Sequence, residues 1–70
     1  MKVGDVVTFI DKESRYAKWF LYQIGVVEEI SQNNTRYCRV RWINPVPYFN
    51  SYSTYSDFKQ SCYEVHDENR

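Results

Sequence analysis

Cys62 and His66 are the residues whose types and spacing come closest to those of a catalytic site. A thiolate beside an imidazole is the minimum for nucleophilic catalysis, and residues four apart on an extended strand lie on the same face. No orienting Asn or Asp, helix N-terminus or oxyanion donor is identifiable around the pair, and a domain of 70 residues lacks a deep cleft. We therefore predict that the chain is not an enzyme and has no catalytic residue.

A metal site is not predicted either. Cys38, Cys62 and His66 supply three potential ligands, but without a Cys-x-x-Cys knuckle they lack the spacing of a preformed chelate. The two cysteines stand far apart among apolar and aromatic residues, unlike the dense cysteines of secreted disulfide scaffolds. We expect two reduced, buried thiols, no metal and no cofactor.

Binding chemistry is better represented, because aromatic residues make up 19% of the chain. Two aromatic segments, residues 16–22 and 48–52, can form a groove if they lie side by side. Such a groove holds a proline-rich peptide or, by cation-π attraction, a cationic headgroup. The predicted protein- or peptide-binding residues are Tyr16, Trp19, Tyr22, Tyr48 and Tyr52. Phe20 and Phe49 are assigned to the core, since Phe is buried more often than Trp or Tyr.

The alternative ligand is RNA or single-stranded DNA. Tyr37, Arg39 and Arg41, joined by Arg36, would share one face of a strand, where a ring can stack on a base and the cations can neutralise phosphates. The same pattern also fits an ordinary solvated face, with an arginine pairing with Glu28 across the hairpin. The formal net charge is zero, which argues against a strongly electrostatic nucleic-acid or membrane partner.

Five short strands are expected to position these side chains. Apolar–polar alternation and β-branched or aromatic residues predict strands over residues 6–10, 22–30, 36–43, 48–54 and 63–66. We expect a loop with one helical turn over 11–21, a hairpin tip over 31–35, a single 3₁₀ turn over 55–58, and a frayed end over 67–70. Pro45 and Pro47 should end the third strand, because proline cannot donate to a β-ladder.

The core is predicted from the apolar phase of each strand. The residues on that phase are Val7, Phe9, Val27, Cys38, Val40, Trp42 and Val65. Gly4-Asp5 should form the turn that launches the first strand, and Gly25 should let two backbones pass closely.

The glycine and aliphatic spacing resembles a known family. Val3-Gly4-Asp5-x-Val7 with Gly25-x-Val27-x-x-Ile30 resembles the KOW motif of transcription-elongation and ribosomal proteins, and Val40-x-Trp42 resembles the third strand of Tudor-like domains. The resemblance implies an all-β fold, a single small five-stranded SH3-like barrel over residues 1–70. The segment before Gly25 is aromatic, whereas KOW loops are basic and contain glycine, which weakens the implied nucleic-acid role.

The sequence thus predicts a small non-enzymatic interaction module that binds a protein or peptide through an aromatic groove. Nucleic-acid binding alongside transcription or translation machinery is the first alternative, and a structural or assembly subunit that dimerises through a strand edge is the second. No stretch approaches the length of a membrane span or a signal peptide, so we expect a cytoplasmic accessory protein that is a monomer or a weak homodimer.

Overall fold

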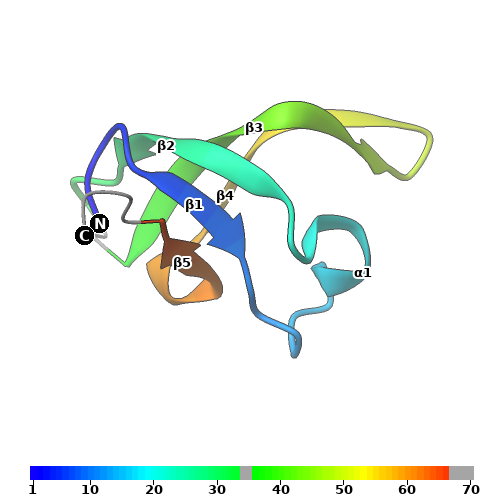
Figure 1. Cartoon of the computed structure of the whole chain (residues 1–70), viewed down its shortest axis with the longest axis horizontal. Helices are drawn as coiled ribbons and strands as arrows, with labels where there is room; N and C mark the ends of the chain where they lie inside the picture. The colour runs from blue at the N-terminus through cyan, green and yellow to red at the C-terminus, as the bar shows by residue number, and fades with distance from the viewer. Residues whose placement is uncertain (34–35, 67–70) are drawn as a thin grey trace.

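The structure is a computed structural model that describes residues 1–33 and 36–66. Its strands are β1 (Val6–Phe9), β2 (Ile24–Ile30), β3 (Tyr37–Tyr48), β4 (Ser51–Lys59) and β5 (Tyr63–Val65). They form one antiparallel sheet in the order β4-β3-β2-β1-β5. One helical turn, α1 (Ala17–Phe20), follows β1, and a 3₁₀ turn, η1 (Gln60–Cys62), precedes β5 (Figure 1). The predictions of an all-β fold, five strands, a helical turn in the first loop and a 3₁₀ turn before the last strand are confirmed.

The short connection between β4 and β5 requires the sheet to curl. These two strands lie at opposite edges of the sheet, which in a flat sheet would be separated by about 19 Å, four spacings of ~4.8 Å. They are joined only by η1, which as a 3₁₀ turn spans about 6 Å. The η1 backbone also bonds to the chain next to β3 and next to β1. Gln60 N–H donates to the carbonyl of Arg36, just before β3, and the Cys62 carbonyl accepts from the N–H of Ile10, just after β1. The two edges therefore approach each other at this end.

The two glycines have the roles that their positions predict. Gly4 has a φ of 96° in the turn before β1, and its N–H donates to the Val27 carbonyl of β2. Gly25 of β2 pairs with Trp42 of β3 at a close approach of the two strands. A Cβ at this position would stand 2.3 Å from Val40 Cγ1 and 2.7 Å from the Arg41 carbonyl oxygen. A side chain at position 25 would therefore push the two strands apart.

The predicted core is confirmed at six of its seven positions. The buried apolar residues are Val7, Phe9, Phe20, Val27, Cys38, Val40, Trp42, Val46, Cys62 and Tyr63. Val65 was predicted wrongly, because it is 38% exposed. It pairs with Val7 on the predicted phase, but it is the last residue of a three-residue edge strand, where little covers it. Cys62 and Tyr63 fill the core at this end instead.

The prediction that the prolines end the third strand was wrong. β3 continues through both prolines to Tyr48, and Val46 between them is buried. The reason is a bulge: Arg41 pairs with Tyr55 and Val46 with Ser53, so residues 42–45 lie opposite the single residue Thr54. Pro45 falls where the ladder is already interrupted and needs no donor, and bulges of this kind bend the sheet.

Because the third strand was ended too early, the fourth strand and the 3₁₀ turn were also predicted too early in the chain. The expected strand 48–54 and 3₁₀ turn 55–58 are replaced by one long strand, β4, and the 3₁₀ turn begins at Gln60.

β2 begins at Ile24 rather than at Tyr22, whose φ of 66° is incompatible with a strand. Asn34 and Thr35 of the predicted hairpin tip and the predicted frayed end 67–70 lie outside the described residues. Within the described part of the chain, no helix is long and apolar enough to cross a membrane.

Candidate functional site

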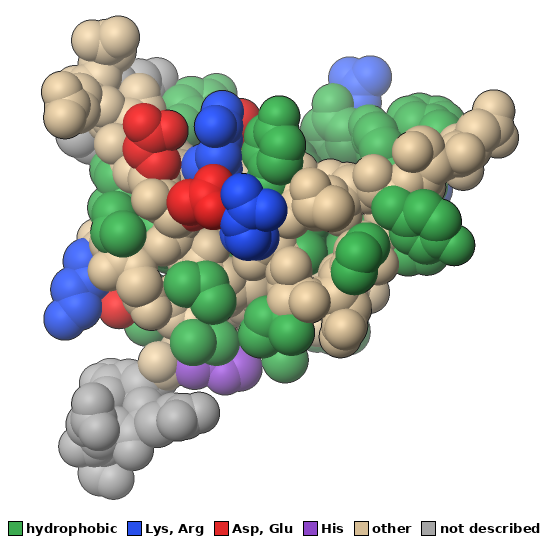
Figure 2. Space-filling view, turned by 90° about the horizontal axis from the view of Figure 1, so that it is seen from above, with side chains coloured by type: hydrophobic (Ala, Val, Ile, Leu, Met, Phe, Trp, Pro, Cys, Tyr) green, Lys and Arg blue, Asp and Glu red, His purple; other side chains and the backbone are tan. Residues whose placement is uncertain are grey.

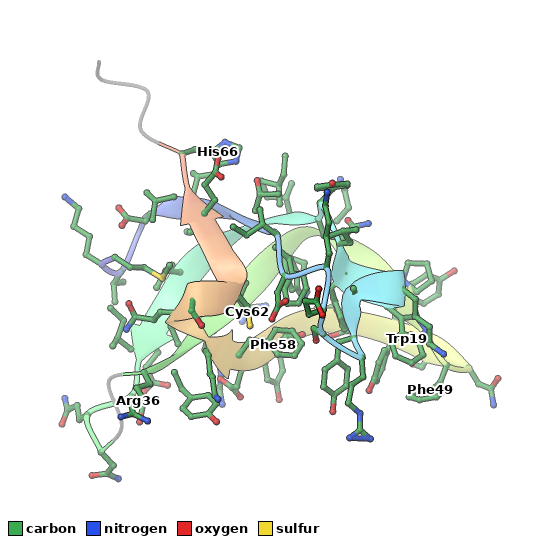
Figure 3. The ribbon with its side chains drawn as sticks, turned by 90° about the horizontal axis from the view of Figure 1, so that it is seen from below. Trp19, Arg36, Phe49, Phe58, Cys62 and His66 are labelled. Carbon is green, nitrogen blue, oxygen red and sulfur yellow. The ribbon has the colours of Figure 1, made fainter. Side chains whose placement is uncertain are left out.

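The two predicted aromatic segments meet at one end of the molecule. The Trp19 ring lies against Tyr48 at a centroid distance of 4.8 Å and against Phe49 at 4.9 Å, with Tyr16 6.3 Å away. Tyr48 and Phe49 are themselves 4.5 Å apart in an edge-to-face arrangement. Figure 3 labels Trp19 and Phe49 beside each other at this end of the molecule. We call Tyr16, Trp19, Tyr48 and Phe49 the ring cluster.

On helix α1, the adjacent residues Phe20 and Trp19 point in different directions, the first into the core and the second to the surface. Phe20 is buried and stacks on Trp42 at 5.3 Å with an interplanar angle of 21°. Trp19 is only half-buried, because consecutive residues of a helical turn point in directions about 100° apart. The Trp42 indole N–H donates to Ser56 Oγ at 3.0 Å, which satisfies the one polar group of this core ring. α1 thus fixes its own position through Phe20 and presents Trp19 to the surface.

A groove with a volume of about 510 Å³ begins at the ring cluster. The lining residues are Tyr16, Phe20, Tyr48 and the consecutive β4 residues 52–58. Side chains alternate between the two faces of a strand, so a cavity on one face would be lined by every second residue. Because seven consecutive residues of β4 line it, this groove follows the edge of the strand, with α1 on its other side.

Two cations flank the rings of Tyr16 and Trp19 at the start of α1. The Lys18 ammonium lies 4.3 Å from the centroid of the Trp19 ring, and the Arg15 guanidinium carbon lies 5.7 Å from that of Tyr16. Among the described residues neither cation has a carboxylate within ion-pair distance. Asp57 lines the groove but is held by Arg39. The charge left available beside the groove is therefore positive.

The structure brings together four of the five residues predicted to bind a peptide. Tyr16, Trp19 and Tyr48 belong to the ring cluster, and Tyr52 lines the groove. Tyr22 is 60% exposed and, within the described part of the chain, belongs neither to the ring cluster nor to the groove lining.

Sequence reasoning missed three aromatic residues of the site. Phe49 was assigned to the core but is 73% exposed, because β3 runs on to Tyr48 and leaves Phe49 in the turn before β4. Tyr55 and Phe58, placed in the expected 3₁₀ turn, line the groove from β4. Residues 51–56 contain threonine and tyrosine, which favour strands, and neither glycine nor proline, a signal that could have identified them.

The predicted basic face is present, but its charges are paired within the molecule. Arg39 donates to both carboxylate oxygens of Asp57, at 3.1 and 3.2 Å, and its guanidinium also lies 4.8 Å from the Tyr55 ring centroid. Arg41 donates to Glu28 at 2.5 Å, the cross-hairpin pair that the sequence allowed. These hydrogen bonds and charges raise the pKa of both arginines. Acidic and basic side chains accordingly lie next to one another on the face seen in Figure 2 rather than in separate patches.

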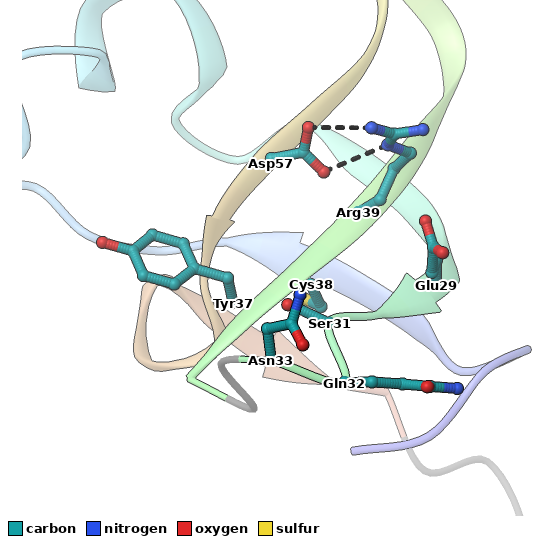
Figure 4. A pocket seen from close by; sticks show the side chains of 8 residues that line it. All are labelled: Glu29, Ser31, Gln32, Asn33, Tyr37, Cys38, Arg39 and Asp57. Atoms are coloured by element: carbon teal, nitrogen blue, oxygen red, sulfur yellow. Dashed lines mark hydrogen bonds and ion pairs between the residues drawn. The ribbon is translucent and has the colours of Figure 1, made fainter.

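A second cavity, of about 470 Å³, lies beside this basic face (Figure 4). Its lining residues are Glu29, Ser31, Gln32, Asn33, Tyr37, Cys38, Arg39 and Asp57. Two carboxylates against one arginine give it no excess of positive charge, so it does not favour phosphate. Arg36 is exposed and lies just before Tyr37, and Figure 3 places it far from Trp19.

The cysteines and the histidine do not form a joint site. Cys62 lies in η1 with its thiol 3.5 Å from Asp11 Oδ2, whereas the His66 imidazole is hydrogen-bonded to the Thr8 hydroxyl. Both cysteines are free and buried, as predicted. Burial raises the pKa of the Cys38 thiol to about 11, and burial with the hydrogen bond to Asp11 raises that of Cys62. Neutral thiols at physiological pH are poor nucleophiles. Among the described residues, no group of three or more His, Cys, Asp or Glu is placed to hold a metal.

No family model, no curated protein and no solved structure matches this chain. The assignment of function therefore depends on the geometry of the site.

Proposed function

We propose that this chain is a non-enzymatic interaction module that binds a peptide, or a peptide-like segment of a protein, through the groove between α1 and β4. The observation that carries the proposal is the ring cluster, four connected rings that are half-buried or exposed at the end of an open groove. Connected apolar surface of this kind usually marks a binding site on a small soluble domain. Tyr and Trp also give large contact areas at a low cost in conformational entropy.

Phe49 supports the proposal independently. It occupies the first position of the two-residue turn between Tyr48 and Ser51, with a φ of 54°. Turns with a positive φ at this position prefer glycine, and a bulky side chain there strains the backbone. A phenyl ring that is both strained and 73% exposed adds little to the core, so its presence is explained best if a ligand uses it.

Arg15 and Lys18, the two cations beside the ring cluster, limit the class of ligand. A cationic headgroup would have to displace Lys18 and Arg15 from the rings that they already cover, and it would meet their positive charge. An uncharged or acidic peptide meets no such competition. The groove therefore fits a peptide better than a methylated or basic tail.

Nucleic-acid binding through Arg36, Tyr37, Arg39 and Arg41 stays a prediction with less support, because two of the arginines are already paired with carboxylates. Assembly through a strand edge also stays a prediction, for which β4 is the longer of the two edges. A cytoplasmic location is part of the proposal, since two free, buried thiols suit a reducing compartment.

We also propose that the curled sheet is a small SH3-like barrel, whose edge strands β4 and β5 come together at η1 and leave the rest of the β4 edge open. The curl imposed by η1, the bend at the β3 bulge and the close crossing at Gly25 support this interpretation. In that arrangement the first loop and the β3–β4 turn would lie side by side, as the ring cluster requires.

A peptide selection tests the proposed function. A random-peptide display library is panned in parallel against the wild-type chain and against Trp19→Ala, with Tyr22→Ala as the matched control, because Tyr22 is an exposed aromatic residue outside the groove. We expect sequence families that are enriched on the wild type and on Tyr22→Ala but not on Trp19→Ala. Enrichment of the same families on all three, or of none on the wild type, would refute the proposal.

A further inference from the structure

The free edge of β4 is long and poorly protected against strand pairing, since the bulge opposite Thr54 lies in the partner strand β3 and not in β4 itself. β4 has nine residues, and among the described residues it pairs only with β3. Edge strands are normally protected by proline, bulges or inward-pointing charges, or are kept very short. The first six residues of this one, 51–56, contain neither a charge nor a proline, and the charged residues Asp57 and Lys59 come only at its end. Such an edge is a template for another strand.

Among the described residues, the peptide groups of β4 that point away from β3 have no backbone partner. Within the described residues, every backbone hydrogen bond outside the ladders joins other parts of the chain, and none involves residues 51–59. Within the strand, Ser53 Oγ donates to the Tyr55 carbonyl. The groove follows this same edge, so it gives access to unpaired donors and acceptors as well as to the rings.

The charges beside the groove indicate the chemistry of the partner. Within residues 1–33 and 36–66, Arg15 and Lys18 flank the ring cluster without a carboxylate partner, whereas Asp57 is neutralised by Arg39. An acidic side chain on the ligand would supply the missing counter-charge. The rings of Tyr16, Tyr48 and Phe58 offer an apolar wall to alternate residues of an extended chain.

We propose that the ligand is an extended acidic peptide that adds as a strand to the free edge of β4. This inference rests on the proposed function and specifies the binding mode and the partner. The peptide backbone pairs with residues 52–58, every second side chain is apolar or aromatic and contacts the rings, and a carboxylate faces Arg15 and Lys18. Neither a proline-rich helix nor a basic tail satisfies this combination, because the first lacks donors for the ladder and the second has the wrong charge.

The test uses the most enriched peptide from the selection, synthesised as a series of analogues. Each analogue carries one N-methyl group on its backbone, at a different position. N-methylation removes a backbone donor and adds bulk, so in an added strand it weakens binding only where the N–H faces β4. We expect losses of about tenfold or more at every second position and little change between them. Slower hydrogen exchange of the β4 amides on peptide binding provides a second readout.

The charge component is tested by variants of both partners. Replacing the peptide carboxylates by amides should weaken binding to the wild type several-fold but leave binding to Arg15→Gln/Lys18→Gln nearly unchanged. Lys2→Gln, which removes an exposed cation at the N-terminus, is the matched control and should behave as the wild type.

Each contrary outcome is informative. If the losses of affinity on N-methylation show no two-residue period, or if affinity does not depend on the peptide carboxylates, this inference is overturned and the proposed function is left intact. A stable dimer in light scattering whose β4 amides are protected without peptide would make a second copy of the chain the occupant. Nucleic acid that protects the β4 amides instead of peptide would also overturn it, and the lack of any binding peptide would overturn both proposals.

Discussion

Replacing Phe49 by glycine should separate stability from binding. The Phe49 ring loses contacts with Trp19 and Tyr48, at 4.9 and 4.5 Å, each worth about 0.5–1.5 kcal/mol. Against this loss, glycine relieves a left-handed backbone that costs about 1–2 kcal/mol in other residues. Glycine also costs roughly 0.5–1 kcal/mol in chain entropy. The net change in unfolding free energy for Phe49→Gly should thus lie between a gain of about 0.5 kcal/mol and a loss of about 3 kcal/mol.

Phe20→Ala is the matched comparison, because Phe20 is an aromatic residue from the same region but is 2% exposed. Truncating a buried Phe costs about 3–5 kcal/mol, a large part of the roughly 4–10 kcal/mol expected for a domain of this size. Urea denaturation followed by circular dichroism measures both variants. A Phe49→Gly variant destabilised as much as Phe20→Ala would refute the reasoning, because it would make Phe49 a structural residue. Unchanged peptide affinity in a folded Phe49→Gly would remove this ring from the site.

Three further predictions concern the close strand crossing, the basic face and the thiols. Gly25→Ala should lower the unfolding free energy by at least the ~1–3 kcal/mol of an overpacked core, and with it the urea midpoint, since its Cβ would meet Val40 and the Arg41 carbonyl. In gel shifts at low salt, Asp57→Asn/Glu28→Gln should bind single-stranded RNA more strongly than the wild type, because both arginines lose their carboxylates. The melting temperature should fall between pH 9 and 11, because the folded protein holds the pKa of Cys38 at about 11 against an ordinary 9.0.

The controls follow from the same contacts. An unchanged midpoint for Gly25→Ala would contradict the close crossing of β2 and β3. A strong RNA shift by the wild type that Arg39→Ala/Arg41→Ala abolishes would restore the nucleic-acid alternative. The folded state keeps the thiol neutral, so its stabilising effect is complete below pH 9 and is lost as the pH rises toward 11. Cys38→Val should therefore show a smaller decline, and an identical decline would refute the assignment.

The parts of the fold set by local alternation were predictable from the sequence. Val7 and Phe9, and likewise Val40 and Trp42, alternate with polar residues, and a register error of one residue would have exposed them all. The turn at Gly4 and the crossing at Gly25 were predictable because each position has a conformational or steric requirement that glycine meets.

The β3–β4 hairpin was not predictable by the same reasoning. Proline is a reliable strand breaker only where its N–H is needed, and the bulge opposite Thr54 removes that need at Pro45. A bulge depends on the partner strand, so no local rule reveals it. The error hid Tyr55 and Phe58 from the groove, which shows how one missed irregularity displaces site residues. Phe49 was assigned to the core for a different reason, the general tendency of Phe to be buried, which its position in the turn overrides.

Three of the four members of the ring cluster were predictable from the sequence, but its surroundings were not. Trp19 and Tyr48 could be paired from their positions in irregular, aromatic segments. The unpaired edge of β4 and the two cations beside the rings required the three-dimensional arrangement.

The most direct test of the central claim is the affinity of the selected peptide for Trp19→Ala, measured by isothermal titration calorimetry against the wild type and Tyr22→Ala. If Trp19 anchors the ligand, its removal should cost at least about 2 kcal/mol, a roughly 30-fold rise in Kd, while the circular dichroism spectrum stays that of the folded wild type. Tyr22→Ala should bind within about twofold of the wild type, since Tyr22 lies outside the groove. A folded Trp19→Ala variant that binds the peptide as tightly as the wild type would contradict the claim that the aromatic groove is the binding site.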